Sequence, residues 1–386
     1  WEPHAHITSE ELKYYVAHIN PKGKPDGWFY DSFLIVSGRA PSGNMLYYDF
    51  NMGTTRCGGG DFFAVPSSNP ATVKDWSDYL DGFFSKDGLV ARLDECIAGM
   101  KTAMKGAPPF KRNLVISVPY PHHNQARFGK AGGGKTELNF SIIGQNLMHA
   151  SEQRLEACRW LADEAVARFK KGKFANLNLL GFYWIYESLH YSWDVDDHWV
   201  IKEFYKHLRS RGMRFFWIPF FSTYNITIMS NSRDLYFDCA FLQPNHIFYP
   251  WLKDVQTAAD AARARGGGIE MEYYLEIDQT VGVGKEKYKR VKNYLDGGVK
   301  FGYMKDSACA WFTGMNDMHR MARHPDPRER NVYDDFYRFA IGEYGACLLY
   351  TSDAADDLLC VDLGGRRIIK KKKKHPYILR KSTIKT

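Results

Sequence analysis

The stretch NLLGFYWIYE, residues 178–187, runs from aliphatic into aromatic side chains and ends on a glutamate. The polar segment SLHYSWDVDDH follows it directly. A buried parallel strand reads as a nearly continuous apolar run, and in an α/β barrel the active site is built at the carboxyl ends of such strands. The stretch therefore predicts a strand that carries Glu187 to the mouth of a barrel.

Apolar runs of strand length alternate with longer segments of helical period, a pattern typical of repeated βα units. Eight runs are predicted as strands: 12–20, 28–36, 113–121, 177–187, 214–221, 238–248, 268–276 and 299–304. The clearest amphipathic helices are predicted at 74–105, 151–171, 198–211, 252–265, 285–295 and 332–344. These elements predict an α/β fold of the (β/α)8 TIM-barrel type. An open doubly wound sheet is the main competitor, but its glycine fingerprint is missing from the first βα turn.

Two long segments rich in glycine and polar residues, 37–68 and 119–147, follow predicted strands. Loops in that position lie at the carboxyl-terminal mouth of a barrel and commonly shape a substrate cleft. No internal repeat or linker marks a second domain. Residues 1–346 are therefore predicted to form a single barrel domain, with an N-terminus that has been truncated.

Residues 347–386 differ in character from the rest of the chain. The segment CLLYTSDAAD resembles a translated transposase adapter of sequencing libraries, and VDLGGRRII with its lysine run resembles a translated flow-cell adapter. We expect a disordered, non-native tail and exclude it from the fold. A basic arm that binds nucleic acid or an anionic membrane is the alternative, because lysine runs occur in such arms.

The charge of the chain depends on this tail, which carries six of the eight net positive charges at pH 7. Without it no basic stripe or nucleic-acid-binding motif remains, so no nucleic-acid partner is expected. No apolar run approaches the ~20 residues of a membrane-spanning helix, so no transmembrane segment is expected either. The seven cysteines show no CxxC spacing, which argues against a zinc ribbon or a disulfide scaffold.

The segment GKAGGGKT, residues 129–136, matches the phosphate-loop pattern letter for letter. That loop must leave a strand directly and open a helix whose N-terminus meets the phosphates. Here the glycines come well after the predicted strand, and the residues that follow read as extended. A flexible glycine loop is the favoured interpretation.

The predicted strand at 268–276 carries two glutamates on one face. Alternation puts Ile269 and Met271 on one side and Glu270 and Glu272 on the other. In a barrel the glutamates would face the interior. Burying two carboxyl groups there costs several kcal/mol unless they form ion pairs or take part in function. A structural ion pair with Lys305 or Arg214 is the alternative to a catalytic role.

Aromatic and polar residues near the predicted mouth are candidates for substrate binding. Aromatic rings suit the C–H faces of sugars, although rings at strand ends are more often core. Amide side chains at a strand end bind hydroxyl groups well. The candidates are Asp31, His122, Trp184, Tyr186, Trp217, Gln243, Asn245, Tyr303 and Trp311.

Histidines near the predicted mouth raise the question of a metal. A His-x-His pair on the first strand and a His-Glu-x-x-His motif are both missing from the sequence. No metal and no cofactor are therefore expected.

Several segments together resemble a known family. They include YVAHIN, FYDSFLIV, GFYWIYES, LQPNHIF, GIEMEYY and YDDFYRFAIGEYG. Their order and spacing are similar to those of the bacterial DUF4855 family across residues 12–345. The resemblance implies a glycoside-hydrolase-like barrel and an extracytoplasmic location, and it implies no established substrate.

Barrel glycosidases of the large retaining clan carry the acid/base at the end of strand 4 and the nucleophile at the end of strand 7. By strand order Glu187 is the expected acid/base, held protonated among aromatics, and Glu272 is the expected nucleophile, held ionised near cations. Glu270 is the alternate nucleophile or an orienting partner. The sequence thus predicts a secreted bacterial glycoside hydrolase acting on a polysaccharide or glycan. A non-catalytic carbohydrate-binding barrel is the alternative, and a metal-dependent hydrolase is a further one.

Overall fold

The computed structural model describes residues 7–44, 46, 54–56, 62–64, 70–220, 236–249, 254–276, 286–314 and 316–345. The adapter-like tail at 347–386 lies outside the described residues, as does much of the glycine-rich segment 37–68. Within the described part, no helix is both long enough and apolar enough to cross a membrane.

Seven strands form one parallel sheet in the order β13-β12-β11-β10-β7-β6-β3. Spatial order follows chain order and every neighbouring pair is parallel, as expected of successive βα units. The strands are β3 (Ser32–Ile35), β6 (Arg112–Val118), β7 (Leu177–Trp184), β10 (Arg214–Trp217), β11 (Cys239–Leu242), β12 (Gly268–Glu272) and β13 (Cys309–Phe312).

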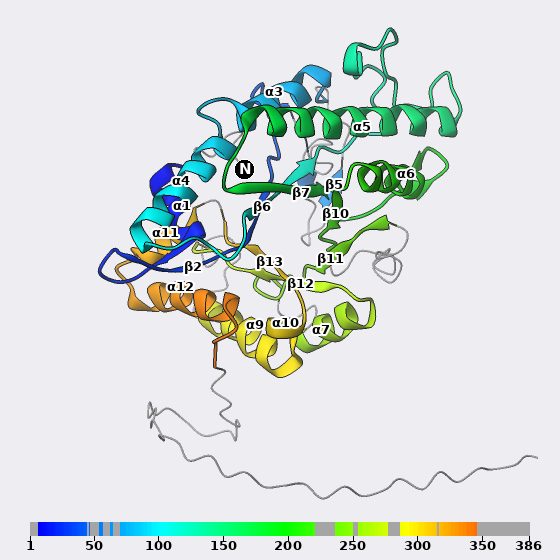
Figure 1. The fold of residues 1–386 in the computed structure, drawn as a ribbon. Coiled ribbons are helices and arrows are strands. Elements are labelled where there is room, and N and C mark those ends of the chain that lie inside the picture. The colour runs from blue at the N-terminus through cyan, green and yellow to red at the C-terminus, as the bar shows by residue number, and fades with distance from the viewer. Residues whose placement is uncertain are drawn as a thin grey trace, which may run out of the picture. The chain divides into compact units, whose positions relative to one another are not determined.

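Helices between the strands cover one face of this sheet (Figure 1). Figure 1 shows α5 and α6 beside β7 and β10, and α7 beside β12, in agreement with the contacts between these elements. The helices are α1 (Ser9–Val16), α3 (Val73–Phe84), α4 (Leu89–Met104), α5 (Leu147–Gly172), α6 (Asp197–Ser210), α7 (Val255–Ala264), α9 (Lys287–Phe301), α10 (Tyr303–Asp306), α11 (Asp317–Ala322) and α12 (Pro327–Ala340).

Three short antiparallel pairs stand apart from the main sheet. They are β1 (Ala17–Ile19) with β2 (Pro25–Trp28), β4 (Thr54–Arg56) with β5 (Phe62–Ala64), and β8 (Tyr191–Ser192) with β9 (Val195–Asp196).

The prediction of a closed (β/α)8 barrel is wrong, and the first reason is the segment 12–20. Most of it belongs to helix α1, which begins with a capping box: the Glu11 backbone N–H donates to Thr8 Oγ1 at 3.2 Å, and Glu11 Oε2 accepts from the Thr8 backbone N–H at 2.7 Å. Such reciprocal bonds satisfy free donors of the first turn and start a helix. Only Ala17–Ile19 is extended, and it pairs with β2 rather than with the main sheet.

The second reason is the segment 299–304, which is the end of α9, its cap and the start of α10. Gly302 ends α9 with a φ of +89°, in the left-handed region that glycine adopts without strain. Gly298 lets the helix pack closely, because a Cβ there would lie 2.2 Å from the ring of Phe339 in α12. The strand that the sequence reading missed is β13, a few residues later.

The sheet is therefore a curled half-barrel with β3 and β13 at its edges. In the described residues these two strands are not hydrogen-bonded to each other. The curl nevertheless brings them near one another, since Tyr30, just before β3, packs against Trp311 of β13 at a centroid distance of 5.5 Å.

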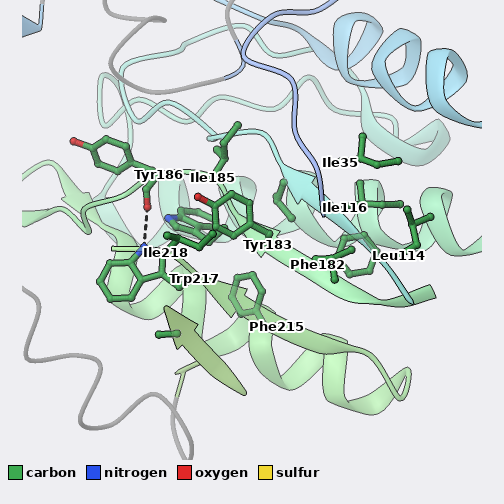
Figure 2. Packing of buried hydrophobic residues seen from close by; sticks show 14 of the residues in the cluster. Ile35, Leu114, Ile116, Phe182, Tyr183, Ile185, Tyr186, Phe215, Trp217 and Ile218 are labelled. Carbon is green, nitrogen blue, oxygen red and sulfur yellow. Dashed lines mark hydrogen bonds between the residues drawn. The ribbon is translucent and has the colours of Figure 1, made fainter. Parts of the chain in front are cut away.

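Alternation along β7 and β10 sorts their side chains between the two faces of the sheet. Phe182 and Trp184 pair in register with Phe215 and Trp217. Phe215 packs edge-on against Phe204 of α6 at 5.2 Å, so these four rings lie on the helix-covered face. Figure 2 shows Phe182, Phe215 and Trp217 of this group, together with the hydrogen bond, 2.9 Å long, from the Trp217 indole N–H to the Tyr186 carbonyl. Tyr183, between Phe182 and Trp184, points to the inner face.

Asp197, the first residue of α6, anchors the connection that follows β7. The side chain is fully buried and pairs with the Arg154 guanidinium of α5. It also accepts hydrogen bonds from Tyr120 Oη at 3.1 Å and from the His190 backbone N–H at 2.8 Å. The end of β6, the start of α6 and the loop after Glu187 are thereby tied to one carboxylate.

We predict that Asp197→Ala lowers the free energy of unfolding by about 3–5 kcal/mol, because it leaves the Arg154 guanidinium buried without its partner. Urea unfolding measures the change. Asp163→Ala is the matched control: its 2.9 Å pair with Arg211 is about half exposed and contributes no more than about 1 kcal/mol. Equal losses in the two variants would contradict the assignment.

Candidate active site

Strand β12 carries two buried glutamates on the inner face of the sheet. Glu270 and Glu272 are only 6% and 1% exposed. Met271, between them, is in register with Trp311, which packs against Phe336 of α12 at 5.0 Å. Met271 therefore faces the helices, and the two carboxyl groups point to the opposite side, as the alternation predicts.

Glu272 receives two hydrogen bonds. One comes from the Tyr294 hydroxyl of α9, and the other comes from the backbone N–H of Asn245. Asn245 has a φ of +54°, a conformation in which asparagine is enriched among residues other than glycine. Tyr294 is held in turn, because its hydroxyl accepts the His246 backbone N–H at 3.0 Å. In the described part of the chain, Glu272 Oε1 has no protein partner.

Glu270 lies two residues before Glu272, on the same face of β12. Its Oε2 is buried and makes no hydrogen bond with any described residue. Burial, followed by the charges of Glu272 and Glu187, raises the pKa of Glu270 well above its usual value. The protonated form of this carboxyl group is therefore favoured, since an unpaired buried charge is strongly disfavoured.

In the described part of the chain, neither Arg214 nor Lys305 is found paired with these glutamates. Arg214 binds Asp238 at 2.9 Å, at the amino end of β10, and Lys305 is exposed on α10. No lysine or arginine in the described ranges contributes to the pKa of Glu270 or Glu272.

Glu187 follows β7 by three residues and belongs to the same electrostatic cluster. Its charge raises the pKa of Glu270, of Glu272 and of the buried Tyr183 hydroxyl. On a flat sheet, three strand spacings of ~4.8 Å would separate β7 from β12 by ~14 Å. The curl of the sheet allows the ends of these strands to face one another across its inner side.

The cations expected near Glu272 are not found in the described residues. Burial raises the pKa of Glu272 to about 8, although the donors on Tyr294 and Asn245 oppose that rise. Glu270 has no such donors. Of the two carboxyl groups on β12, Glu272 therefore ionises first.

Uncharged polar groups lie beside the carboxylates. Gln243 and Asn245 follow β11, the neighbour of β12. The Gln243 Oε1 and Asn245 Nδ2 atoms are buried and have no hydrogen-bond partner among the described residues. Such atoms ordinarily bind water or a ligand, so both residues are suited to bind substrate hydroxyls.

His122 belongs to a cluster of rings at the ends of β6 and β7. It stacks on His123 at 4.9 Å, and His123 lies 6.1 Å from His190. Burial lowers the pKa of His122 to about 3 and that of His123 to about 4, so both rings are neutral at pH 7. Tyr186 stacks on His190 at 5.0 Å, with its hydroxyl 2.9 Å from His190 Nε2.

Five predicted substrate-binding residues lie away from the carboxylates. Alternation turns Trp184, Trp217 and Trp311 to the helix-covered face, and the first two are 0% exposed. Tyr303 lies in α10 and donates its hydroxyl to the Tyr294 carbonyl. Asp31 precedes β3 and is therefore at the amino end of the sheet, opposite to the glutamates.

Sequence reasoning missed Tyr294 and the backbone of Asn245 as partners of Glu272. Tyr294 lies within a predicted helix, where its spacing is that of any core residue. No local pattern distinguishes it. The Asn245 backbone conformation depends on the turn after β11, which the sequence alone does not specify.

In the described residues, neither the glycine loop nor a metal site provides an alternative active site. Residues Ala131–Gly133 form a 3-10 turn, and no helix opens directly after the loop. A surface hollow of about 530 Å³ lies between this loop, α3 and α5, but its carboxylates Asp78 and Glu164 pair with Lys74 and Arg168. Across the described ranges, no three His, Cys, Asp or Glu side chains are positioned to share a metal ion.

A family model described as a domain of unknown function, DUF4855, matches residues 2–338. No curated protein and no solved structure matches the chain. The match confirms the resemblance seen in the sequence. That description states no activity, so the function has to be inferred from the site itself.

We predict that Glu270→Gln weakens the pH dependence of stability. The pKa of Glu270 is raised in the folded state, so the folded protein binds more protons than the unfolded chain above ~4.3, the usual glutamate pKa. The contribution of Glu270 to stability should therefore fall as the pH rises from about 5 to about 8, and the variant, which lacks that contribution, should gain a few degrees in Tm relative to the wild type over this range.

Thermal unfolding across this pH range tests the prediction. Glu95→Gln, on the exposed side of α4, is the control and should follow the wild type. The burial argument fails if Glu270→Gln shows the same pH dependence as the wild type.

Proposed function

The chain belongs to the DUF4855 family, and we propose that it is a glycoside hydrolase that cleaves a polysaccharide or glycan between Glu187 and Glu272. The observation that carries this proposal is the cluster of three glutamates at the ends of β7 and β12. Burying carboxyl groups side by side without a cation costs several kcal/mol. Such carboxyl groups are commonly found at functional sites, where they bind or react with a ligand.

The proposed roles follow from the environments of the three groups. Glu272 has two hydrogen-bond donors and a free Oε1 among the described residues, so it ionises more readily than Glu270 and is the better suited of the two to be the nucleophile. Glu270 lacks such donors and suits a neutral orienting partner. Glu187, three strands away, is suited to be the acid/base. Counted from β3 as the first strand of the sheet, β7 is the third strand and β12 is the sixth. They are three strands apart, as are the fourth and seventh strands of the predicted barrel.

The proposed reaction has two steps. In the first, Glu187 gives its proton to the glycosidic oxygen while the Glu272 carboxylate attacks the anomeric carbon, so that the C–O bond breaks and a glycosyl ester forms. In the second, Glu187 takes a proton from water, and the resulting oxygen nucleophile attacks the anomeric carbon. The ester bond breaks, and both glutamates return to their starting states.

Neighbouring groups support the binding of a sugar. The buried side chains of Gln243 and Asn245 offer hydrogen bonds to hydroxyl groups, and the neutral rings of His122 and His123 add further polar atoms at the mouth. An extracytoplasmic location is part of the same proposal, because a polysaccharide does not cross a lipid bilayer unaided.

We predict that Glu187→Gln and Glu272→Gln each lower the rate of glycan cleavage by about 10³-fold or more, because each removes an ionisable group that the reaction needs. Release of reducing ends from a panel of polysaccharides measures the rate. Glu137→Gln, an exposed glutamate on the loop after β6, is the control and should cleave at the wild-type rate.

Near-normal cleavage by either glutamine variant would rule out the proposed roles. A wild-type protein that binds members of the panel but releases no products would favour the non-catalytic, carbohydrate-binding alternative. Unchanged thermal unfolding of the variants shows that any loss is not a loss of folding.

We also predict that Tyr294→Phe moves the acidic limb of the pH–rate profile to higher pH. The hydroxyl of Tyr294 donates to Glu272 and so lowers its pKa relative to burial alone. Without that donor the pKa of Glu272 rises, and the nucleophile ionises at higher pH. The dependence of kcat/KM on pH measures the shift, and a limb that stays in place or moves down would contradict the role of Glu272.

A further inference from the structure

A short hairpin projects from the loop that follows Glu187. It consists of β8 and β9, with Tyr191 opposite Asp196 and Ser192 opposite Val195. Its base is closed by the Asp197 backbone N–H, which donates to the His190 carbonyl at 2.9 Å, and by the bond from the His190 N–H to the Asp197 carboxylate. Because Asp197 is itself fixed by Arg154, the hairpin is held in a defined position.

Two aromatic rings on this hairpin face solvent. Tyr191 is 69% exposed and Trp193 is 79% exposed. In the described part of the protein the only other aromatic side chain of comparable exposure is Phe110, just before β6 at the amino end of the sheet. The anchored hairpin therefore presents two exposed aromatic rings, and exposed aromatic surface commonly marks a binding site.

A continuous set of contacts joins this hairpin to the glutamate site. Tyr186, next to Glu187, stacks on His190, and His190 neighbours His123. The His123 ring lies 3.8 Å from the carboxylate of Asp194, at the hairpin turn. The two exposed rings thus lie a few residues and a few ring contacts away from the proposed acid/base.

We propose, resting on the proposed function, that Tyr191 and Trp193 form a platform for further sugar units of a polymeric substrate. An aromatic ring binds the C–H face of a sugar, and carboxylate and hydroxyl groups such as those of Asp194 and Ser192 bind its hydroxyls. The substrate class is therefore a polysaccharide chain that extends beyond the bond held between Glu187 and Glu272, rather than a small glycoside.

Trp193→Ala and Tyr191→Ala test the platform through chain-length dependence. On a polysaccharide that the wild type cleaves, each variant should lower kcat/KM by about 2- to 10-fold, while cleavage of the shortest oligosaccharide substrate stays at the wild-type rate. Phe110→Ala removes a similarly exposed ring at the opposite end of the sheet and should change neither activity. Equal losses on long and short substrates, or no loss on the polymer, would overturn the proposal.

A binding measurement separates this proposal from the catalytic one. The Glu187→Gln/Glu272→Gln protein is run through native gels that contain arabinoxylan, galactomannan, mixed-linkage β-glucan or polygalacturonate. Retardation that Trp193→Ala removes and Phe110→Ala preserves supports the platform, even if the wild type cleaves nothing. If none of these polymers retards the protein, or if Trp193→Ala is retarded equally, the platform is refuted, whatever the outcome for the glutamates.

Discussion

The burial of two carboxyl groups on the same face of β12 is the constraint on which the site depends. A protein interior tolerates such groups only when they are protonated or supplied with donors. Burial raises the pKa of Glu270 and favours its protonated form, whereas Glu272 accepts hydrogen bonds from the Tyr294 hydroxyl and the Asn245 backbone N–H. The left-handed conformation of Asn245 and the close packing of α9, which carries Tyr294, both serve this arrangement.

The two faces of the curled sheet carry different kinds of side chain. The helix-covered face holds large rings such as Trp184 and Trp217, which are fully buried and stabilise the packing. The inner face carries Tyr183 and the glutamates. Exposed aromatic surface lies instead on the hairpin after Glu187, which the buried Arg154–Asp197 pair holds in position.

Periodicity predicted the parts of the structure that depend on local sequence. The continuous apolar run before Glu187 is strand β7, and the alternation in GIEME orients Glu270 and Glu272 together. The parallel sheet in chain order also follows from the repeated βα pattern, and the family match confirms the resemblance.

The closed barrel was wrong because short apolar runs fit helix and strand equally well. A capping box turned residues 9–16 into a helix, and helix α9 extended into the run at 299–304. The donors to Glu272 could not be predicted, since Tyr294 and Asn245 reach it only through the packing of α9 and the turn after β11. Trp184, Trp217 and Trp311 were candidates by type, but alternation directs them to the helices.

The most direct test of the account is chemical rescue of Glu272→Gly by azide. If Glu272 is the nucleophile opposite Glu187, the variant should not cleave the glycan that the wild type cleaves, because no group attacks the anomeric carbon. Azide, which fits the space left by the carboxylate, should restore cleavage and yield a glycosyl azide. Cleavage at the wild-type rate without azide, or a variant that azide leaves inactive, would contradict the assignment.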